Sequence, residues 1–172
     1  TLDRSSAASD VYKRQALLFS LVGDVFLMLP GDYFIPGLAS FLVAHLFYIA
    51  LFRQGQAWFP SRTALLGVLA FGGVVYAVLW SHLGNPVLQG AVAAYVGVIS
   101  LMAAQALGRA MATGDAAARW VGAAACIFML SDALIAVNKF LTPVPLASFW
   151  VLLTYYAAQL LIVHHVRGRR SR

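Results

Sequence analysis

The chain has 172 residues, of which 62% are hydrophobic and only 10% are charged. Soluble domains carry about 25% charged residues, so this composition excludes an ordinary soluble domain and indicates an integral membrane protein. The net charge of +6 does not indicate nucleic-acid binding, because the basic residues stand at the ends of apolar segments. The single cysteine, Cys126, excludes an intramolecular disulfide, and no Cys/His spacing typical of a zinc site is present.

The first fifteen residues are polar and aperiodic, unlike the rest of the chain. The chain starts with Thr1, and the string DVYKRQ at residues 10–15 resembles translated adapter sequence at the broken end of a reading frame. We therefore expect residues 1–15 to be a non-native or disordered segment, and the chain to be a fragment of a longer protein.

Six apolar segments follow, at residues 16–29, 34–52, 63–81, 86–107, 120–141 and 146–166. A transmembrane helix needs about 20 apolar residues, and five of the segments have that length. The first segment is shorter, as expected if its beginning is lost. Gly, Pro and Asn residues separate the segments, and no period-2 alternation indicates strands. The sequence therefore predicts an all-α, polytopic transmembrane bundle with six helices in this chain.

The arginine residues predict the orientation of the bundle. Arg53 and Arg62 flank the second loop, Arg109 and Arg119 flank the fourth, and further arginines crowd the tail at 167–172. The first, third and fifth loops contain neither Lys nor Arg. Because positive residues favour the cytoplasmic side, we expect the even-numbered loops and the C-terminal tail to be cytoplasmic, in a bacterial inner membrane.

Two carboxyl groups lie inside otherwise apolar segments. The chain has six acidic residues, all Asp, and two of them, Asp24 and Asp132, fall within residues 16–29 and 120–141. An ionisable group at membrane depth costs about 2.5–3.5 kcal/mol on insertion scales, which makes it a functional-site candidate. We therefore predict a functional role for both aspartates. The structural alternative is a buried ion pair with a Lys or His residue.

Six further polar side chains lie in the second, fifth and sixth segments: His45, Tyr48, Asn138, Lys139, Tyr155 and Gln159. Lipid cannot satisfy these groups, so we expect them to converge on an interior cavity. Tyr155 and Gln159 stand four residues apart and therefore share one helix face. The structural alternatives are a hydrogen-bonded core histidine for His45 and, for Lys139, an ammonium group that reaches the membrane interface.

Four sequence blocks resemble the YhhN-like lysoplasmalogenase family of membrane proteins: LLFSLVGDVFLMLP (17–30), GLASFLVAHLFYIALF (37–52), GAAACIFMLSDALIAVNKF (122–140) and TYYAAQLLIV (154–163). They occur in the family's order and approximate spacing, whereas residues 63–107 match only in hydropathy. The resemblance implies an eight-helix bundle whose first two helices this chain lacks. It also implies hydrolysis of the vinyl ether bond of lysoplasmalogens to a fatty aldehyde and glycerophospho-ethanolamine or -choline.

Cleavage of a vinyl ether begins with protonation of its distal alkene carbon, and water then attacks the resulting oxocarbenium ion. The reaction needs a protonated carboxylic acid and a second group that stabilises the cation and deprotonates water, as in glycosidases. Burial and a nearby second carboxyl group favour the protonated form of a carboxyl group. We therefore predict that Asp24 and Asp132 form the acid/base pair, with either as the acid. His45 is predicted to orient one carboxylate or the water.

The remaining polar side chains are predicted to bind substrate. Tyr48, Tyr155 and Gln159 would hydrogen-bond its polar region, while Asn138 and Lys139 would contact the phosphate group or, alternatively, tune the neighbouring aspartate. A slot between helices would take the alkenyl chain. The expected partners are therefore a lysophospholipid substrate and membrane lipids, and no nucleic acid.

No cofactor is expected, because water adds to an already activated cation. A metal ion bound by Asp24, His45 and Asp132 is the less favoured alternative. The main alternative function is a small-molecule or proton-coupled transporter that uses the same buried Asp, His and Lys side chains. Against it, no helix is interrupted by proline at mid-depth and no inverted repeat is evident. A purely structural or lipid-binding membrane protein is a third interpretation.

Overall fold

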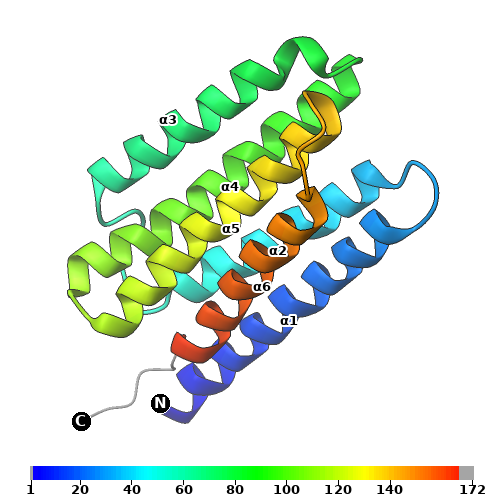
Figure 1. Ribbon diagram of the computed structural model, residues 1–172. Coiled ribbons are helices and arrows are strands. Elements are labelled where there is room, and N and C mark those ends of the chain that lie inside the picture. The colour runs from blue at the N-terminus through cyan, green and yellow to red at the C-terminus, as the bar shows by residue number, and fades with distance from the viewer. Residues whose placement is uncertain (1, 167–172) are drawn as a thin grey trace.

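Helices make up almost all of the described chain. The computed structural model describes the backbone of residues 2–166 and the side chains of residues 7–166, so the predicted basic tail at 167–172 lies outside the described residues. The helices, shown in Figure 1, are α1 (Leu2–Met28), α2 (Phe34–Arg53), α3 (Arg62–Leu79), α4 (Pro86–Thr113), α5 (Ala116–Phe140) and α6 (Ala147–His165), with a 3-10 turn η1 (Trp80–His82) after α3. The predicted all-α bundle of six helices is confirmed.

Five helices, α2 to α6, are long and apolar enough to cross a membrane. The protein is therefore an integral membrane protein. Their bounds extend by a few residues past some of the predicted apolar segments, most clearly in α4 and α5, which meet at the turn around Gly114. The polar ends of these helices need no lipid contact, because a helix of 28 residues is about 42 Å long and exceeds the ~30 Å hydrocarbon core.

The first helix is longer than the sequence predicted. The sequence predicted a helix from residue 16, with a polar segment before it, whereas α1 begins at Leu2. Residues 2–15 contain neither Gly nor Pro and include the strong helix formers Leu, Ala, Arg, Lys and Gln, so the helix continues through them. The predicted helix start is corrected accordingly, while the non-native origin of residues 1–15 stays a prediction.

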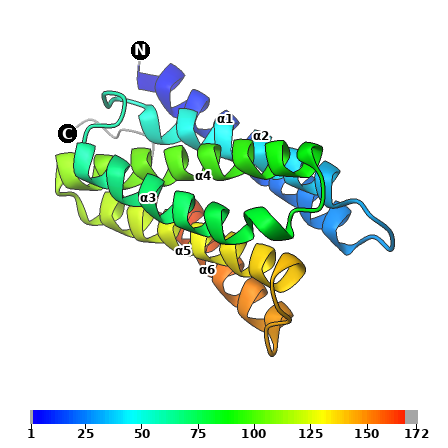
Figure 2. The same ribbon diagram turned by 90° about the horizontal axis from the view of Figure 1, so that it is seen from above.

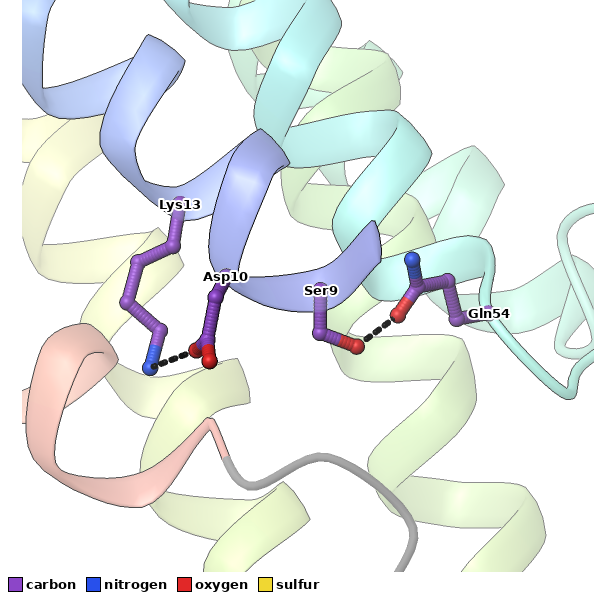
Figure 3. Close-up of polar contacts among 4 residues, drawn as sticks. All are labelled: Ser9, Asp10, Lys13 and Gln54. Atoms are coloured by element: carbon purple, nitrogen blue, oxygen red, sulfur yellow. Dashed lines mark hydrogen bonds and ion pairs between the residues drawn. The ribbon is translucent and has the colours of Figure 1, made fainter. Parts of the chain in front are cut away.

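The N-terminal half of α1 is attached to α2. Ser9 donates a hydrogen bond to Gln54, immediately past the end of α2 (Figure 3), and Ala16 is fully buried. On the same part of α1, Lys13 Nζ lies 3.8 Å from Asp10 Oδ1 (Figure 3). An exposed ion pair of this kind contributes about 0–1 kcal/mol, so packing against α2 is the larger stabilising contribution.

Side-chain caps begin three of the helices at the breaks that the sequence predicted. Ser61, Asn85 and Asp115 accept hydrogen bonds from the backbone nitrogens three residues later, at 3.2, 2.8 and 3.2 Å. Gly114 ends α4 with a φ of 64°, a left-handed conformation that glycine adopts without strain. These contacts satisfy backbone groups that the helix ends leave unpaired.

The helices pack in the order α1, α2, α4, α5, α6, and α3 lies on the outer side of α4 (Figure 1). α3 is joined to the rest of the bundle mainly through α4 and touches α5 only slightly. Figure 2 shows α1 and α2 diverging from α5 and α6 toward the end of the bundle that carries the loops 29–33 and 141–146. Long side chains, such as Tyr155 of α6, connect α6 to α1.

The two ends of the bundle differ in charge. Arg53, Arg62, Arg109 and Arg119 stand at the ends of α2 to α5 that meet at the second and fourth loops, and we call this the arginine end. The loops at the opposite end contain neither Lys nor Arg. The prediction that the arginine end faces the cytoplasm depends on this difference in charge.

Candidate functional site

A cavity of about 560 Å³, here called the polar cavity, is lined by residues of α1, α2, α5 and α6 and lies toward the end of the bundle opposite the arginine end. Asp24 of α1 and Asp132 of α5 both line it. Their side chains are partly exposed, and the two groups are near enough to interact electrostatically. Gly31 and Tyr33 of the first loop also line the polar cavity, so it reaches the ends of the helices.

Asp24 ends a line of hydrogen bonds that runs into the core. Tyr155 Oη donates to Asp24 Oδ2 at 2.9 Å, and Gln159 Nε2 donates to Tyr155 Oη at 3.2 Å. The phenol of Tyr48, which is fully buried, donates to Gln159 Oε1. The spacing of Tyr155 and Gln159 on α6 therefore places both on the face toward α1 and α2, and this line connects three helices.

Asp132 has a different phenol partner. Tyr95 of α4 donates its hydroxyl hydrogen bond to Asp132 Oδ2, and its side chain is almost completely buried. The ring packs edge-on against His45, with centroids 5.4 Å apart. Both phenols are thus held by aromatic packing, Tyr95 against His45 and Tyr155 against Phe128, and Tyr155 also accepts a hydrogen bond from Gln159.

Sequence reasoning missed Tyr95. It lies in the region 86–107, whose resemblance to the family rests on hydropathy alone. The available signal was a single phenol among the small and aliphatic residues at the middle of this segment (GAVAAYVGVIS). A phenol at membrane depth needs a hydrogen-bond partner, and a carboxyl group on a neighbouring helix supplies one.

Asn138 and Lys139 line the polar cavity at its mouth, where both are exposed. Asn138 Oδ1 accepts a hydrogen bond from the backbone nitrogen of Val144 at 2.9 Å and so fixes the loop after α5. The Lys139 ammonium lies 4.9 Å from the centre of the Phe34 ring. Among the described residues it has no ion pair with Asp132, so the ammonium remains available to a ligand in the cavity.

His45 lies apart from the polar cavity. It is fully buried between the rings of Tyr95 and Phe128, and neither of its ring nitrogens hydrogen-bonds to another side chain in the described part of the chain. Within residues 7–166, no group of three His, Cys or Asp side chains is arranged to hold a metal ion. The structure therefore brings Asp24, Asp132, Tyr155 and Gln159 together. The ring of Tyr95 lies between His45 and Asp132.

A second, narrow pocket of about 60 Å³, here called the apolar slot, adjoins the polar cavity at Asp132. Helices α1 to α5 all contribute to it, and its lining is apolar except for Asp132 and Tyr95. Leu27, Phe34 and Phe41 line both the slot and the cavity. The Asp132 carboxyl group thus stands at the boundary between an apolar and a polar compartment.

This geometry suits acid/base chemistry on an amphiphile. Two carboxyl groups that face one cavity can exchange protons with a bound molecule, one donating while the other accepts. A polar cavity joined to an apolar slot matches a ligand with a polar head and a hydrocarbon chain. The reacting bond of such a ligand would lie near Asp132, where the two compartments meet.

Comparison with known proteins gives a consistent set of relatives. The family model of the YhhN family matches residues 4–166. Lysoplasmalogenase TMEM86A from Homo sapiens is 39% identical over 156 residues, which cover 85% of this chain and 61% of that protein. Lysoplasmalogenase TMEM86B from Homo sapiens is 43% identical over 147 residues, with 86% and 59% covered. The lysoplasmalogenase of Mycobacterium bovis is 32% identical over 153 residues, with 86% and 57% covered.

The chain spans about 60% of the length of these curated relatives. No solved structure matches it. The family match includes α2 to α6 and all of α1 except its first two residues, and with them both carboxyl groups of the polar cavity. The chain belongs to the YhhN family.

Proposed function

We propose that this protein is a membrane hydrolase that cleaves the vinyl ether bond of lysoplasmalogens. The products would be a fatty aldehyde and glycerophospho-ethanolamine or -choline. The observation that carries the proposal is the pair Asp24 and Asp132, which line one cavity from two helices, with an apolar slot beginning at Asp132. The names of the relatives, all lysoplasmalogenases, support the same reaction class.

The compartments favour Asp132 as the acid. The distal alkene carbon of a vinyl ether is the atom that accepts the proton, and it lies on the hydrocarbon side of the ether oxygen. Asp132 lines both the apolar slot and the polar cavity, whereas Asp24 lines only the cavity. In the first step Asp132 transfers its proton to that carbon, which leaves an oxocarbenium ion and the Asp132 carboxylate.

Asp24 is then the base. Water adds to the oxocarbenium carbon, and the Asp24 carboxylate takes one of its protons to give a hemiacetal. The hemiacetal collapses when its hydroxyl proton passes to Asp132 and the protonated Asp24 donates to the leaving ether oxygen. The carbon–oxygen bond breaks, aldehyde and alcohol form, and both carboxyl groups regain their starting protonation states.

The other polar side chains assist in this scheme. Tyr155 and Tyr95 each donate a hydrogen bond to one carboxyl oxygen, which leaves the other oxygen of that group for proton transfer. His45 orients Asp132 indirectly, because its ring packs against Tyr95. Gln159 and Tyr48 hold Tyr155 in place from the core side.

The head group would lie toward the mouth of the polar cavity. Lys139 supplies a positive charge for the phosphate there, and Asn138 lies beside it. Because the arginine end is expected to be cytoplasmic, the mouth of the cavity would open on the other side of a bacterial inner membrane. The C-terminus would lie in the cytoplasm.

The test is release of aldehyde from a vinyl-ether lysophospholipid by the purified protein in lipid nanodiscs. We expect release by the wild type in the absence of any ion gradient, and loss of release in Asp132→Asn and Asp24→Asn. Asp115→Asn is the matched control, because Asn caps a helix as well as Asp does and residue 115 lies at the arginine end.

Near-normal release by either cavity variant would contradict the acid/base assignment. Binding of the substrate without any cleavage by the folded wild type would favour a lipid-binding protein. Gradient-dependent uptake into vesicles without aldehyde would favour the transporter.

A further inference from the structure

Gly23 stands immediately before Asp24 on α1 and lies against the ring of Phe41 on α2. Resting on the function proposed above, we propose that Gly23 and Phe41 together position the Asp24 carboxyl group beside Tyr155. Both residues are buried, and Phe41 lines the polar cavity and the apolar slot. Neither side chain can transfer a proton, so both are positioning residues for the proposed base.

A side chain at position 23 has no room. A Cβ atom there would lie 2.6 Å from Phe41 Cδ2 and 2.7 Å from Phe41 Cε2, whereas carbon atoms in contact are normally about 3.5–4.0 Å apart. On α2, a Cβ atom at Gly37 would lie 2.9 Å from Leu27 Cδ2 and 3.4 Å from the Gly23 carbonyl oxygen. The two glycines therefore allow α1 and α2 to approach each other closely beside Asp24.

The Phe41 ring also contacts the phenol that donates to Asp24. Its centre lies 6.0 Å from the centre of the Tyr155 ring, with the two rings edge-on at 90°. One ring therefore packs against the residue before Asp24 and against the hydrogen-bond donor of Asp24 on α6. The thickness of this ring contributes to the distance between α1 and α6, which the 2.9 Å bond from Tyr155 to Asp24 spans.

The two helices that carry Asp24 and Tyr155 are attached differently. α6 packs along α5, and Ser131 Oγ of α5 donates a hydrogen bond to the Val151 carbonyl oxygen of α6 at 3.2 Å. α1 packs almost entirely on α2. A methyl group at position 23 therefore either moves α1, and Asp24 with it, or pushes the Phe41 ring toward Tyr155. Because packed side chains transmit such displacements, both changes disturb the bond between Asp24 and Tyr155.

The experiment combines kinetics of aldehyde release with infrared spectra of the protein in nanodiscs, with isotope-labelled aspartate carboxyl groups. The Asp24 band is identified by its absence in Asp24→Asn. We expect Gly23→Ala to shift this band in the same direction as Tyr155→Phe, and to lower kcat by roughly 10–100-fold, the factor for one hydrogen bond to a charged group. Gly67→Ala is the matched control, because a Cβ atom at Gly67 on α3 meets nothing within 4 Å.

A second substitution tests the contact itself. Phe41→Leu removes the ring edge that a methyl group at position 23 would meet. Gly23→Ala combined with Phe41→Leu should therefore recover part of the band position and part of kcat relative to Gly23→Ala alone. A general loss of stability would instead make the double variant worse than either single variant.

A further matched pair applies if Gly23→Ala lowers the melting temperature strongly. Phe47 also lies on α2 and packs against Phe19 of α1, with ring centres 5.6 Å apart, but it lines neither the slot nor the cavity. Phe41→Leu should shift the Asp24 band, because Tyr155 loses a packing partner, and Phe47→Leu should leave the band in place.

An unchanged Asp24 band in Gly23→Ala, or no recovery in the double variant, would overturn the proposal. A rise in KM alone with an unchanged band would also overturn it, since the ring would then only obstruct the cavity. Aldehyde release by the wild type is recorded separately. Band shifts without any aldehyde from the wild type would keep the positioning role and reject the hydrolase, while aldehyde release with an unchanged band would do the reverse.

Discussion

The two carboxyl groups of the polar cavity have matching first partners and different surroundings. Each accepts a hydrogen bond from a buried phenol, Asp24 from Tyr155 and Asp132 from Tyr95. Behind Tyr155 the hydrogen bonds continue into the core, whereas behind Tyr95 there is the ring of His45. Asp132 also borders the apolar slot, which Asp24 does not.

In the proposed function, this difference assigns two roles to the same residue type. A carboxyl group beside an apolar compartment is placed to protonate carbon, and one that faces only a polar cavity is placed to act on water. Substitutions of the same kind at the two carboxyl groups are therefore expected to have different effects.

The largest effect is expected from removal of the carboxyl groups themselves. Asp24→Ala and Asp132→Ala should each lower kcat by roughly 10²–10⁴-fold, the usual contribution of a general acid or base. Added formate should restore part of the rate to Asp24→Ala, because that site faces the polar cavity, and little to Asp132→Ala. Kinetics of aldehyde release with and without formate make this measurement. Equal rescue of both variants would contradict the division of roles.

Loss of the phenols should have a smaller effect. Tyr155→Phe and Tyr95→Phe each remove one hydrogen bond to a carboxyl oxygen, so kcat should fall by roughly 10–100-fold if that bond contributes about 1.5–3 kcal/mol. Steady-state kinetics provide the measurement, with Tyr12→Phe as control because Tyr12 lies in the N-terminal half of α1 and lines neither the slot nor the cavity. Full activity of Tyr95→Phe would show that Asp132 needs no phenol.

Gln159 should act on Asp24 alone, as a positioning residue. Gln159→Leu leaves the fully buried Tyr48 hydroxyl without its acceptor, so we expect a loss of about 1–3 kcal/mol in stability and a reduced kcat with unchanged KM. Thermal melting and kinetics should both be recorded. Gln159→Glu, which can still accept from Tyr48, should recover more stability than Gln159→Leu; equal melting temperatures for the two would contradict this role.

The smallest effect is expected at the mouth of the cavity. Lys139→Gln should raise KM by severalfold without changing kcat, and the difference should shrink at high salt because an exposed charge pair is screened. Lys13→Gln, a substitution of the same charge in the N-terminal half of α1, serves as control. A fall in kcat at constant KM would place Lys139 in the reaction step.

Hydropathy and helix-breaking residues were sufficient to predict the fold. Long apolar segments separated by Gly, Pro and Asn allow only helices in a membrane, since every backbone group must be satisfied within its own segment. The same reasoning misplaced the start of α1, because residues 2–15 are polar and helix formation there depends on propensity and on packing against α2.

The candidate site was only partly predictable. Asp24 and Asp132 are conspicuous because an acidic residue is costly in an apolar segment, and Gln159 follows Tyr155 by one turn. The pairing of Tyr95 with Asp132 depends on how α4 packs against α5, which the sequence does not reveal when a helix is apolar all around. The burial of His45 between two rings has the same origin.

The loose attachment of α3 has a kinetic consequence. This helix exposes large apolar side chains such as Leu66, Phe71 and Val74, and it forms one wall of the slot while resting mainly on α4. We expect the proposed lipid substrate to enter the slot beside α3, from within the bilayer. Turnover should then follow the mole fraction of substrate in the membrane, so that diluting it with inert phospholipid at constant bulk concentration slows the reaction.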